Sequence, residues 1–201
     1  MPLPMILDRP TRFTDADIRP ELRRRALAPY RHDPNTVLIE ELGLMRGLVR
    51  LDLACVNGYI HGYEIKSDRD NLSRLEGQVN IYGKVLDRAT LVASPRHIDS
   101  AFSRLPSWWG IWAVESGKKG PRLMSVRRGS KNPSRDPRSL VELLWQEEAL
   151  KLLEQHAVAT GVRGKARHQL WDRICETLDL ETIAAAVRTQ LKARSTPTDR
   201  H

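Results

Sequence analysis

Two acidic residues and a lysine lie inside segments that otherwise have the composition of apolar β-strands. Asp52 lies in the run LVRLDLACV, and Glu64 and Lys66 lie in the run GYEIKS. Aspartate and glutamate are poor strand formers, so these positions favour a functional site over ordinary charges on an exposed strand face. Carboxylates without a neighbouring imidazole or thiolate favour Mg²⁺ or Mn²⁺. We predict a cation held by Asp52 and Glu64, with the peptide carbonyl of Ile65 as a further ligand.

Such a centre is suited to phosphodiester hydrolysis. The cation would polarise the scissile phosphate and lower the pKa of an attacking water. Lys66 could orient that water or stabilise the charge that develops on phosphorus. Two acids and a lysine packed together would also hold one another's protonation states in place.

The turn between the two strands decides whether this centre can form. Alternation along a strand places Glu64 and Lys66 on one face. A two-residue turn at Asn57-Gly58 would put Asp52 across from Tyr63 and send the two acids to opposite faces.

A three-residue loop would instead bring the carboxylates together. With residues 56–58 as the loop and its glycine left-handed, Cys55 pairs with Tyr59, and Asp52 and Glu64 become diagonal neighbours roughly 7–8 Å apart at the backbone. The chemistry therefore predicts a turn of odd length.

The elements around the centre alternate between helix and strand. In order, the patterns predict a helix from Thr14, strands at Thr36–Leu42, Leu48–Val56 and Tyr59–Lys66, a helix from about Asp68 or Asp70 to Asp87, and a strand at Ala89–Ser94. The last strand can lie parallel to its predecessor through a right-handed crossover. The predicted fold class is α/β, with a core of helix, three-stranded antiparallel meander, helix and strand.

A polar, proline-containing stretch over residues 129–138 is the clearest boundary in the chain. The sequence beyond it has helical patterns. We predict a nuclease-like domain over residues 1–128 and a helical C-terminal region over residues 139–194 that could bind nucleic acid.

The composition suits a polyanionic partner. The 201 residues include 33 Lys and Arg against 25 Asp and Glu, a net charge of +8, and neutralising phosphates releases counterions. The two cysteines, Cys55 and Cys175, lie far apart and indicate neither a disulfide scaffold nor a zinc site. The sequence has no apolar run of membrane-spanning length and no signal-peptide pattern, so we expect a cytoplasmic protein.

These residues resemble the PD-(D/E)XK, or restriction-endonuclease-like, nuclease superfamily. Asp52 takes the place of the motif's aspartate, and Glu64 and Lys66 take those of its E-x-K, while Leu51 replaces the usual proline. The chain is similar to a small bacterial and phage branch in the run Arg50, Asp52, Gly62–Ser67, Asp70, Leu72, Arg74-Leu75, Gln78 and Tyr82. The resemblance spans about residues 14–114. It implies a nuclease that mostly cuts DNA, although some members cut RNA and a minority only bind.

The resemblance also implies supporting residues. It places Gln78 near the metal or the scissile phosphate, on the same helix face as Arg74, and Tyr82 falls on the apolar stripe as a packing residue. Such nucleases often add one more acid. We expect Glu41, with Glu40 and Glu21 as the alternatives.

Two basic clusters could hold phosphates without reading bases. Lys118 and Lys119 lie at an expected hairpin turn, and Arg163, Lys165 and Arg167 precede a helical segment. The alternative for each cluster is a solvated charged loop.

The sequence therefore predicts a Mg²⁺- or Mn²⁺-dependent deoxyribonuclease. Its catalytic residues are Asp52, Glu64, Lys66 and Gln78, and its partner is nucleic acid. Cutting a duplex with one centre per chain would favour a homodimer. The alternative is a catalytically inactive nucleic-acid-binding module on the same fold.

Overall fold

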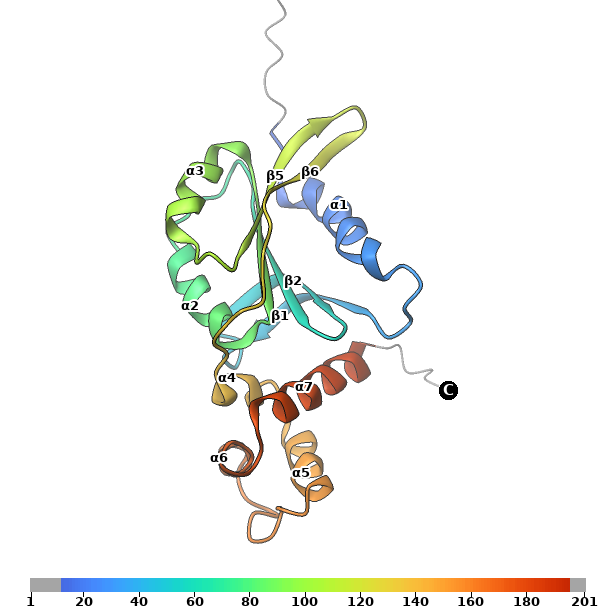
Figure 1. The fold of residues 1–201 in the computed structure, drawn as a ribbon, viewed down its shortest axis with the longest axis vertical. Helices are drawn as coiled ribbons and strands as arrows, with labels where there is room; N and C mark the ends of the chain where they lie inside the picture. The colour runs from blue at the N-terminus through green and yellow to red at the C-terminus, as the bar shows by residue number, and fades with distance from the viewer. Residues whose placement is uncertain (1–11, 196–201) are drawn as a thin grey trace, which may run out of the picture.

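The computed structural model describes residues 12–195 and contains one six-stranded mixed sheet (Figure 1). The strands are β1 (Val37–Leu44), β2 (Val49–Val56), β3 (Ile60–Lys66), β4 (Arg88–Ala93), β5 (Gly110–Gly117) and β6 (Gly120–Arg127). The helices are α1 (Asp15–Leu27), the 3₁₀ turn η1 (Ala28–Tyr30), α2 (Leu75–Val85), α3 (Pro95–Arg104), α4 (Pro137–Val141), α5 (Gln146–Gln155), α6 (Arg167–Thr177) and α7 (Leu180–Ser195). Within residues 12–195, no helix is both long and apolar enough to cross a membrane.

The strands lie side by side in chain order. The β1–β2, β2–β3 and β5–β6 pairs are antiparallel, and the β3–β4 and β4–β5 pairs are parallel. The predicted α/β class is confirmed, and so is the predicted order of helix, antiparallel meander, helix and parallel strand.

Helices cover both faces of the sheet, with α1 on one side and α2 and α3 on the other (Figure 1). The apolar residues of α1 recur at helical spacing, as Ile18, Leu22 and Ala26, and pack on alternate residues of β2 and β3. Those strand residues are Leu53, Cys55, Tyr63 and Ile65. The alternation that buries this set sends Asp52, Glu64 and Lys66 toward the opposite face.

The β2–β3 turn has the predicted odd length but a different position. Val56 pairs with Ile60, so the loop is residues 57–59 rather than 56–58. Gly58 is absent from the residues with positive φ, so the expected left-handed glycine is wrong. The shift places Asp52 directly opposite Glu64 instead of diagonal to it, because the register advances by two positions.

The helix after β3 begins later than predicted. It starts at Leu75, and Asp70 instead accepts hydrogen bonds from the amide N–H and the hydroxyl of Ser67 (2.8 and 2.6 Å). This local bond competes with helix formation and keeps residues 67–74 as a loop.

Helices α4–α7 pack beside the β1–β2 end of the sheet (Figure 1). Buried apolar side chains form one continuous cluster from the sheet and α2 to α7. The predicted linker is itself anchored, because Asn132 Nδ2 donates to the carbonyls of Gly83 and Leu86 at the end of α2 (2.7 and 2.8 Å). The division into two domains stays a prediction, and residues 1–11 of the first lie outside the described residues.

Candidate active site

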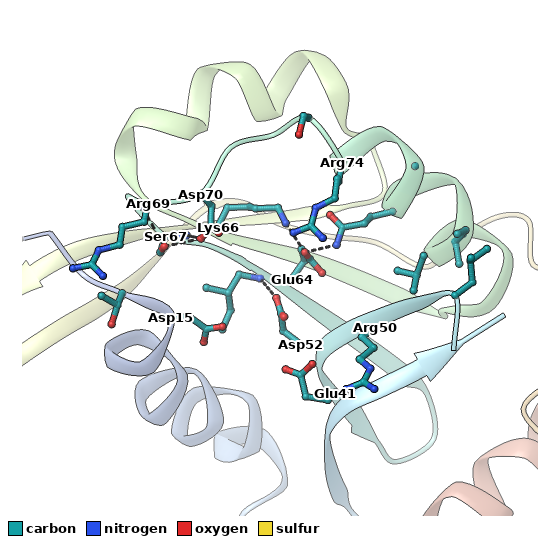
Figure 2. A pocket seen from close by; sticks show the side chains of 18 of the residues that line it. Asp15, Glu41, Arg50, Asp52, Glu64, Lys66, Ser67, Arg69, Asp70 and Arg74 are labelled. Atoms are coloured by element: carbon teal, nitrogen blue, oxygen red, sulfur yellow. Dashed lines mark hydrogen bonds and ion pairs between the residues drawn. The ribbon is translucent and has the colours of Figure 1, made fainter. Parts of the chain in front are cut away.

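The predicted catalytic residues line one cleft of about 1020 Å³ between α1, the β1–β2 hairpin and the first turns of α2 (Figure 2). Asp52, Glu64, Ile65, Lys66 and Gln78 all border it. Glu41 and Arg74 border it as well. Three segments far apart in the sequence thus meet where the motif lies.

Glu64 is buried and fully hydrogen-bonded. Its Oε1 accepts from Lys66 Nζ and Gln78 Nε2, both at 2.6 Å, and its Oε2 accepts from the Tyr82 hydroxyl at 2.7 Å. Glu64 and Lys66 are 3% and 5% exposed, so each charge depends on the other for compensation. The amide oxygen of Gln78 is also buried but has no hydrogen-bond partner in the described chain.

Asp52 faces Glu64 across the end of the β2–β3 ladder. Its Oδ2 accepts from the amide N–H of Ile65 at 2.6 Å, so the side chain replaces a ladder bond where the strands separate. Burial, together with the negative charge of Glu64, raises the pKa of Asp52 to about 7. Two carboxylates that resist joint ionisation are suited to holding a cation.

This raised pKa predicts a pH dependence of stability in protein freed of divalent cations by EDTA. The folded-state pKa of Asp52 lies above its ordinary value of 3.8, so between about pH 4 and pH 7 the folded protein binds more protons than the unfolded chain. The free energy of unfolding should therefore fall as the pH rises through this window. Asp52→Asn should abolish that part of the fall, as measured by urea unfolding at pH 5 and pH 8.

The matched control is Glu115→Gln, which alters an exposed carboxylate on β5. It should leave the pH dependence as in the wild type. Parallel pH profiles for wild type and Asp52→Asn would contradict the assigned pKa.

Glu41 reaches the cleft through an unusual backbone conformation. It lies opposite Asp52 on β1, between the pairs Glu40–Leu53 and Leu42–Leu51, and its φ is +52°. Positive φ is strained for a residue with a side chain and is found at functional sites. Of the three candidate extra acids, Glu41 borders the cleft, whereas Glu40 pairs with Arg23 and Glu21 with Arg24.

Arg19 of α1 contacts each of the acidic residues on one side of the cleft. Its guanidinium donates to both oxygens of Asp15 (3.0 and 2.8 Å), to Glu41 Oε1 (3.1 Å) and to the backbone carbonyl of Asp52 (2.8 Å). It also lies 3.9 Å from Asp52 Oδ1. One arginine therefore supplies positive charge beside these three acids.

Two of these contributors were missed in the sequence. Tyr82 was predicted to pack in the core, and it does, but its hydroxyl also donates to Glu64. Its position one helical turn after Gln78 could have indicated this contact. For Arg19 the sequence offers only the i, i+4 spacing to Asp15, because its other partners, Glu41 and Asp52, come from β1 and β2.

Three arginines whose side chains form no hydrogen bond or ion pair with a described residue border the same cleft. The side chains of Arg50, Arg69 and Arg74 are exposed. Unpaired cations around a carboxylate centre suit a polyanionic ligand.

The other predicted basic clusters lie away from the cleft. Lys118 and Lys119 form the tip of the β5–β6 hairpin, and Arg163 and Lys165 lie in the α5–α6 loop at the other end of the molecule (Figure 1). Arg163 pairs with Glu154, and Arg167 stacks over Trp171. Their binding of nucleic acid stays a prediction.

Among the described residues, no group of three or more His, Cys, Asp or Glu side chains is arranged to hold a metal ion. The donor set still fits a hard cation in its chemistry. The carboxylate oxygens of Asp52 and Glu64 face each other, and oxygen atoms are the ligands that such a cation prefers. Burial and the nearby charge of Glu64 both raise the pKa of Asp52. The partnerless oxygen of Gln78 is a further oxygen donor at the same cleft.

The chain is similar to phage proteins. The family described as bacteriophage P4 protein cII matches residues 25–201, a range that includes Asp52, Glu64, Lys66 and Gln78. Protein cII of Enterobacteria phage P4 is 26% identical over 160 residues. That alignment covers 80% of this chain and 60% of the relative, so the chain spans less than two thirds of the relative's length.

Among solved structures, the SPO1766 protein of unknown function from Silicibacter pomeroyi is similar, with a TM-score of 0.40 and 19% identity. The match covers 78% of this chain and 92% of that chain. At this level of similarity the comparison supports no functional argument. The match to residues 25–201, by contrast, spans most of the sequence, and the chain therefore belongs to the bacteriophage P4 protein cII family.

Proposed function

We propose that this protein is a metal-dependent nuclease that hydrolyses phosphodiester bonds in DNA. The observation that carries the proposal is the meeting of Asp52, Glu64 and Lys66 at the end of the β2–β3 ladder, in a cleft bordered by unpaired arginines. The element order of helix, meander, helix and parallel strand is the one that the restriction-endonuclease-like resemblance implies.

In this proposal Asp52 and Glu64 hold the cation, with Glu41 as the additional acid. A bound Mg²⁺ or Mn²⁺ would supply Lewis-acid activation of the phosphate and of the attacking water. Ile65 orients Asp52 through its amide N–H, and Tyr82 orients Glu64 through its hydroxyl. These two bonds hold the carboxylates in place before substrate arrives, which lowers the cost of organising the site.

Lys66 has two roles that its position allows. In the free protein its ammonium neutralises Glu64 at 2.6 Å. Next to a phosphate in the cleft, the same ammonium can stabilise the negative charge that develops on the oxygens during attack. Gln78 holds Glu64 with its amide N–H and keeps its oxygen available to a water or the cation.

One observation favours a second function, a nucleic-acid-binding module without catalysis. The Lys66 ammonium already neutralises the negative charge of Glu64, so this carboxylate does not require a cation for charge compensation. A module of this kind would bind DNA through Arg50, Arg69 and Arg74 and cut nothing.

One assay separates the two functions. Purified protein is incubated with supercoiled plasmid, single-stranded DNA and RNA, each with Mg²⁺, Mn²⁺ or EDTA, beside Asp52→Asn and the control Glu115→Gln. We expect DNA cutting that requires the metal, is lost in Asp52→Asn and is retained in Glu115→Gln. Binding of DNA without cutting in either metal would favour the module, and cutting confined to RNA would change the substrate but keep the reaction.

A further inference from the structure

The two strands that carry the acids separate where the acids lie. The β2–β3 pairing ends at Leu53–Tyr63, one position before Asp52 and Glu64. Beyond that point β2 stays paired with β1 as far as Val49, and β3 stays paired with β4 as far as Lys66. The cleft therefore lies in a fork, with Asp52 and Glu64 at its base.

Each arm of the fork carries an exposed arginine. Arg50 lies on the β2 arm, and Arg69 lies in the loop that follows β3. Figure 2 shows the two side chains on opposite sides of the Asp52–Glu64 pair. Neither side chain forms a hydrogen bond or ion pair among residues 12–195, and Arg69 has only a weak charge interaction with Asp17. Arg19 beside them, by contrast, contacts the carboxylates of Asp15, Glu41 and Asp52.

A cationic group on each side of the reacting phosphate has a consequence for the substrate. A strand whose scissile phosphate lies at Asp52 and Glu64 would have neighbouring phosphates on both sides, one toward Arg50 and one toward Arg69. An enzyme that removes terminal nucleotides gains nothing from a phosphate contact beyond the chain end. An internal segment of the strand would instead contact both arginines, with one phosphate on each side of the scissile phosphate, and each contact would add binding energy.

We propose that the cleft binds an internal segment of a polynucleotide, so that the protein is an endonuclease; this rests on the nuclease function proposed above. The reaction adds water across an internal P–O bond. The water oxygen bonds to phosphorus, the bond to the departing sugar oxygen breaks, and that oxygen takes up a proton. Arg50 and Arg69 act as positioning residues for the flanking phosphates.

Substrates without ends test the proposal. The protein, with Mg²⁺ or Mn²⁺, is incubated with a covalently closed single-stranded circle and with a linear strand of the same sequence. We expect both to be cut, with the circle giving a full-length linear product first. Degradation of the linear strand with an intact circle would overturn the endonuclease inference and leave the nuclease function standing. Cutting of neither strand, together with no cutting of supercoiled plasmid or RNA, would remove both.

The two arginines are tested by binding in the Asp52→Asn protein, which separates binding from cutting. Arg50→Ala and Arg69→Ala are each compared with Arg24→Ala, an exposed arginine of α1 outside the cleft. The affinity for a single-stranded oligonucleotide is measured by fluorescence anisotropy over a range of salt concentrations. Each cleft variant should reduce the slope of log affinity against log salt by about 0.7, the value for one lost phosphate contact.

The control should keep the slope of the parent protein, and the Arg50→Ala/Arg69→Ala variant should lose about twice as much slope as either single change. A reduced slope in only one of the two single variants would mean that the strand is held on one side of the centre. That result would overturn the proposed role of the fork.

Discussion

Replacing Lys66 by methionine should reduce DNA cleavage by about 10²–10³-fold, the range for loss of one group that stabilises transition-state charge. The same change should lower the free energy of unfolding by about 3–5 kcal/mol, because Glu64 remains buried without its countercharge. The side chains of the pair are only 6% and 3% exposed, so water cannot replace the lost ammonium. Cleavage is measured under single-turnover conditions, and stability is measured by urea unfolding.

A double substitution separates the two effects. Glu64→Gln together with Lys66→Met removes both charges and keeps an oxygen that can accept from Tyr82. Stability should return toward that of the wild type, since replacing a buried ion pair by neutral groups is far less costly than breaking it. Cleavage should not return, because the carboxylate and the ammonium are both missing.

Lys84→Met is the matched control, an exposed lysine in the last turn of α2. It should change neither cleavage nor stability to a comparable extent. Recovery of cleavage in the double variant would contradict a catalytic role for Lys66 and would assign the effect of the single substitution to unfolding.

The second large effect is expected at Asp87, between α2 and β4. Its Oδ2 accepts from the amide N–H of Ile60 at 2.8 Å, and its Oδ1 lies 2.7 Å from Arg135 Nη1. The Asp87–Arg135 contact is an ion pair but not a hydrogen bond, because Arg135 Nη1 does not meet hydrogen-bond geometry with the carboxylate. Arg188 of α7 lies 3.9 Å away on the other oxygen. The carboxylate thus joins the sheet to the predicted linker and to the last helix.

Asp87→Ala should lower the free energy of unfolding by about 3–5 kcal/mol, since the buried Arg135 side chain, 3% exposed, would keep only its ion pair with the exposed Glu181. The midpoint of thermal unfolding should fall by roughly 10 °C, at about 2–4 °C per kcal/mol for a chain of this size. Scanning calorimetry measures both quantities.

The control is Asp172→Ala, which removes a more exposed partner of Arg138. Exposed pairs contribute about 0–1 kcal/mol, so this variant should unfold near the wild-type midpoint. A loss below about 1 kcal/mol for Asp87→Ala would mean that the existing ion pair with Glu181 is enough to compensate the Arg135 guanidinium.

Local patterns in the sequence were sufficient for the order of the first elements and for bringing Asp52, Glu64 and Lys66 together. Strand alternation depends on the backbone alone, so it correctly placed Glu64 and Lys66 on one face. The need for Asp52 on that face then predicted an odd turn, which the structure has at residues 57–59. The parallel return of β4 likewise followed from a strand, a helix and a second strand in succession.

Other features depended on contacts between segments far apart in the chain. The exact register of β2 on β3 does not follow from alternation, because a shift by two positions leaves the same residues facing α1. The local turn residues favoured such a neighbouring alternative. Arg19 meets the backbone carbonyl of Asp52 and the side chain of Glu41 only because α1 packs against β2 and β3. The fork that separates Arg50 from Arg69 arises because β1 and β4 each hold one strand of the hairpin. The alternation of side chains along a strand follows from the sequence alone. The point at which two strands separate depends on their pairing with other strands, and that point determines the shape of the cleft.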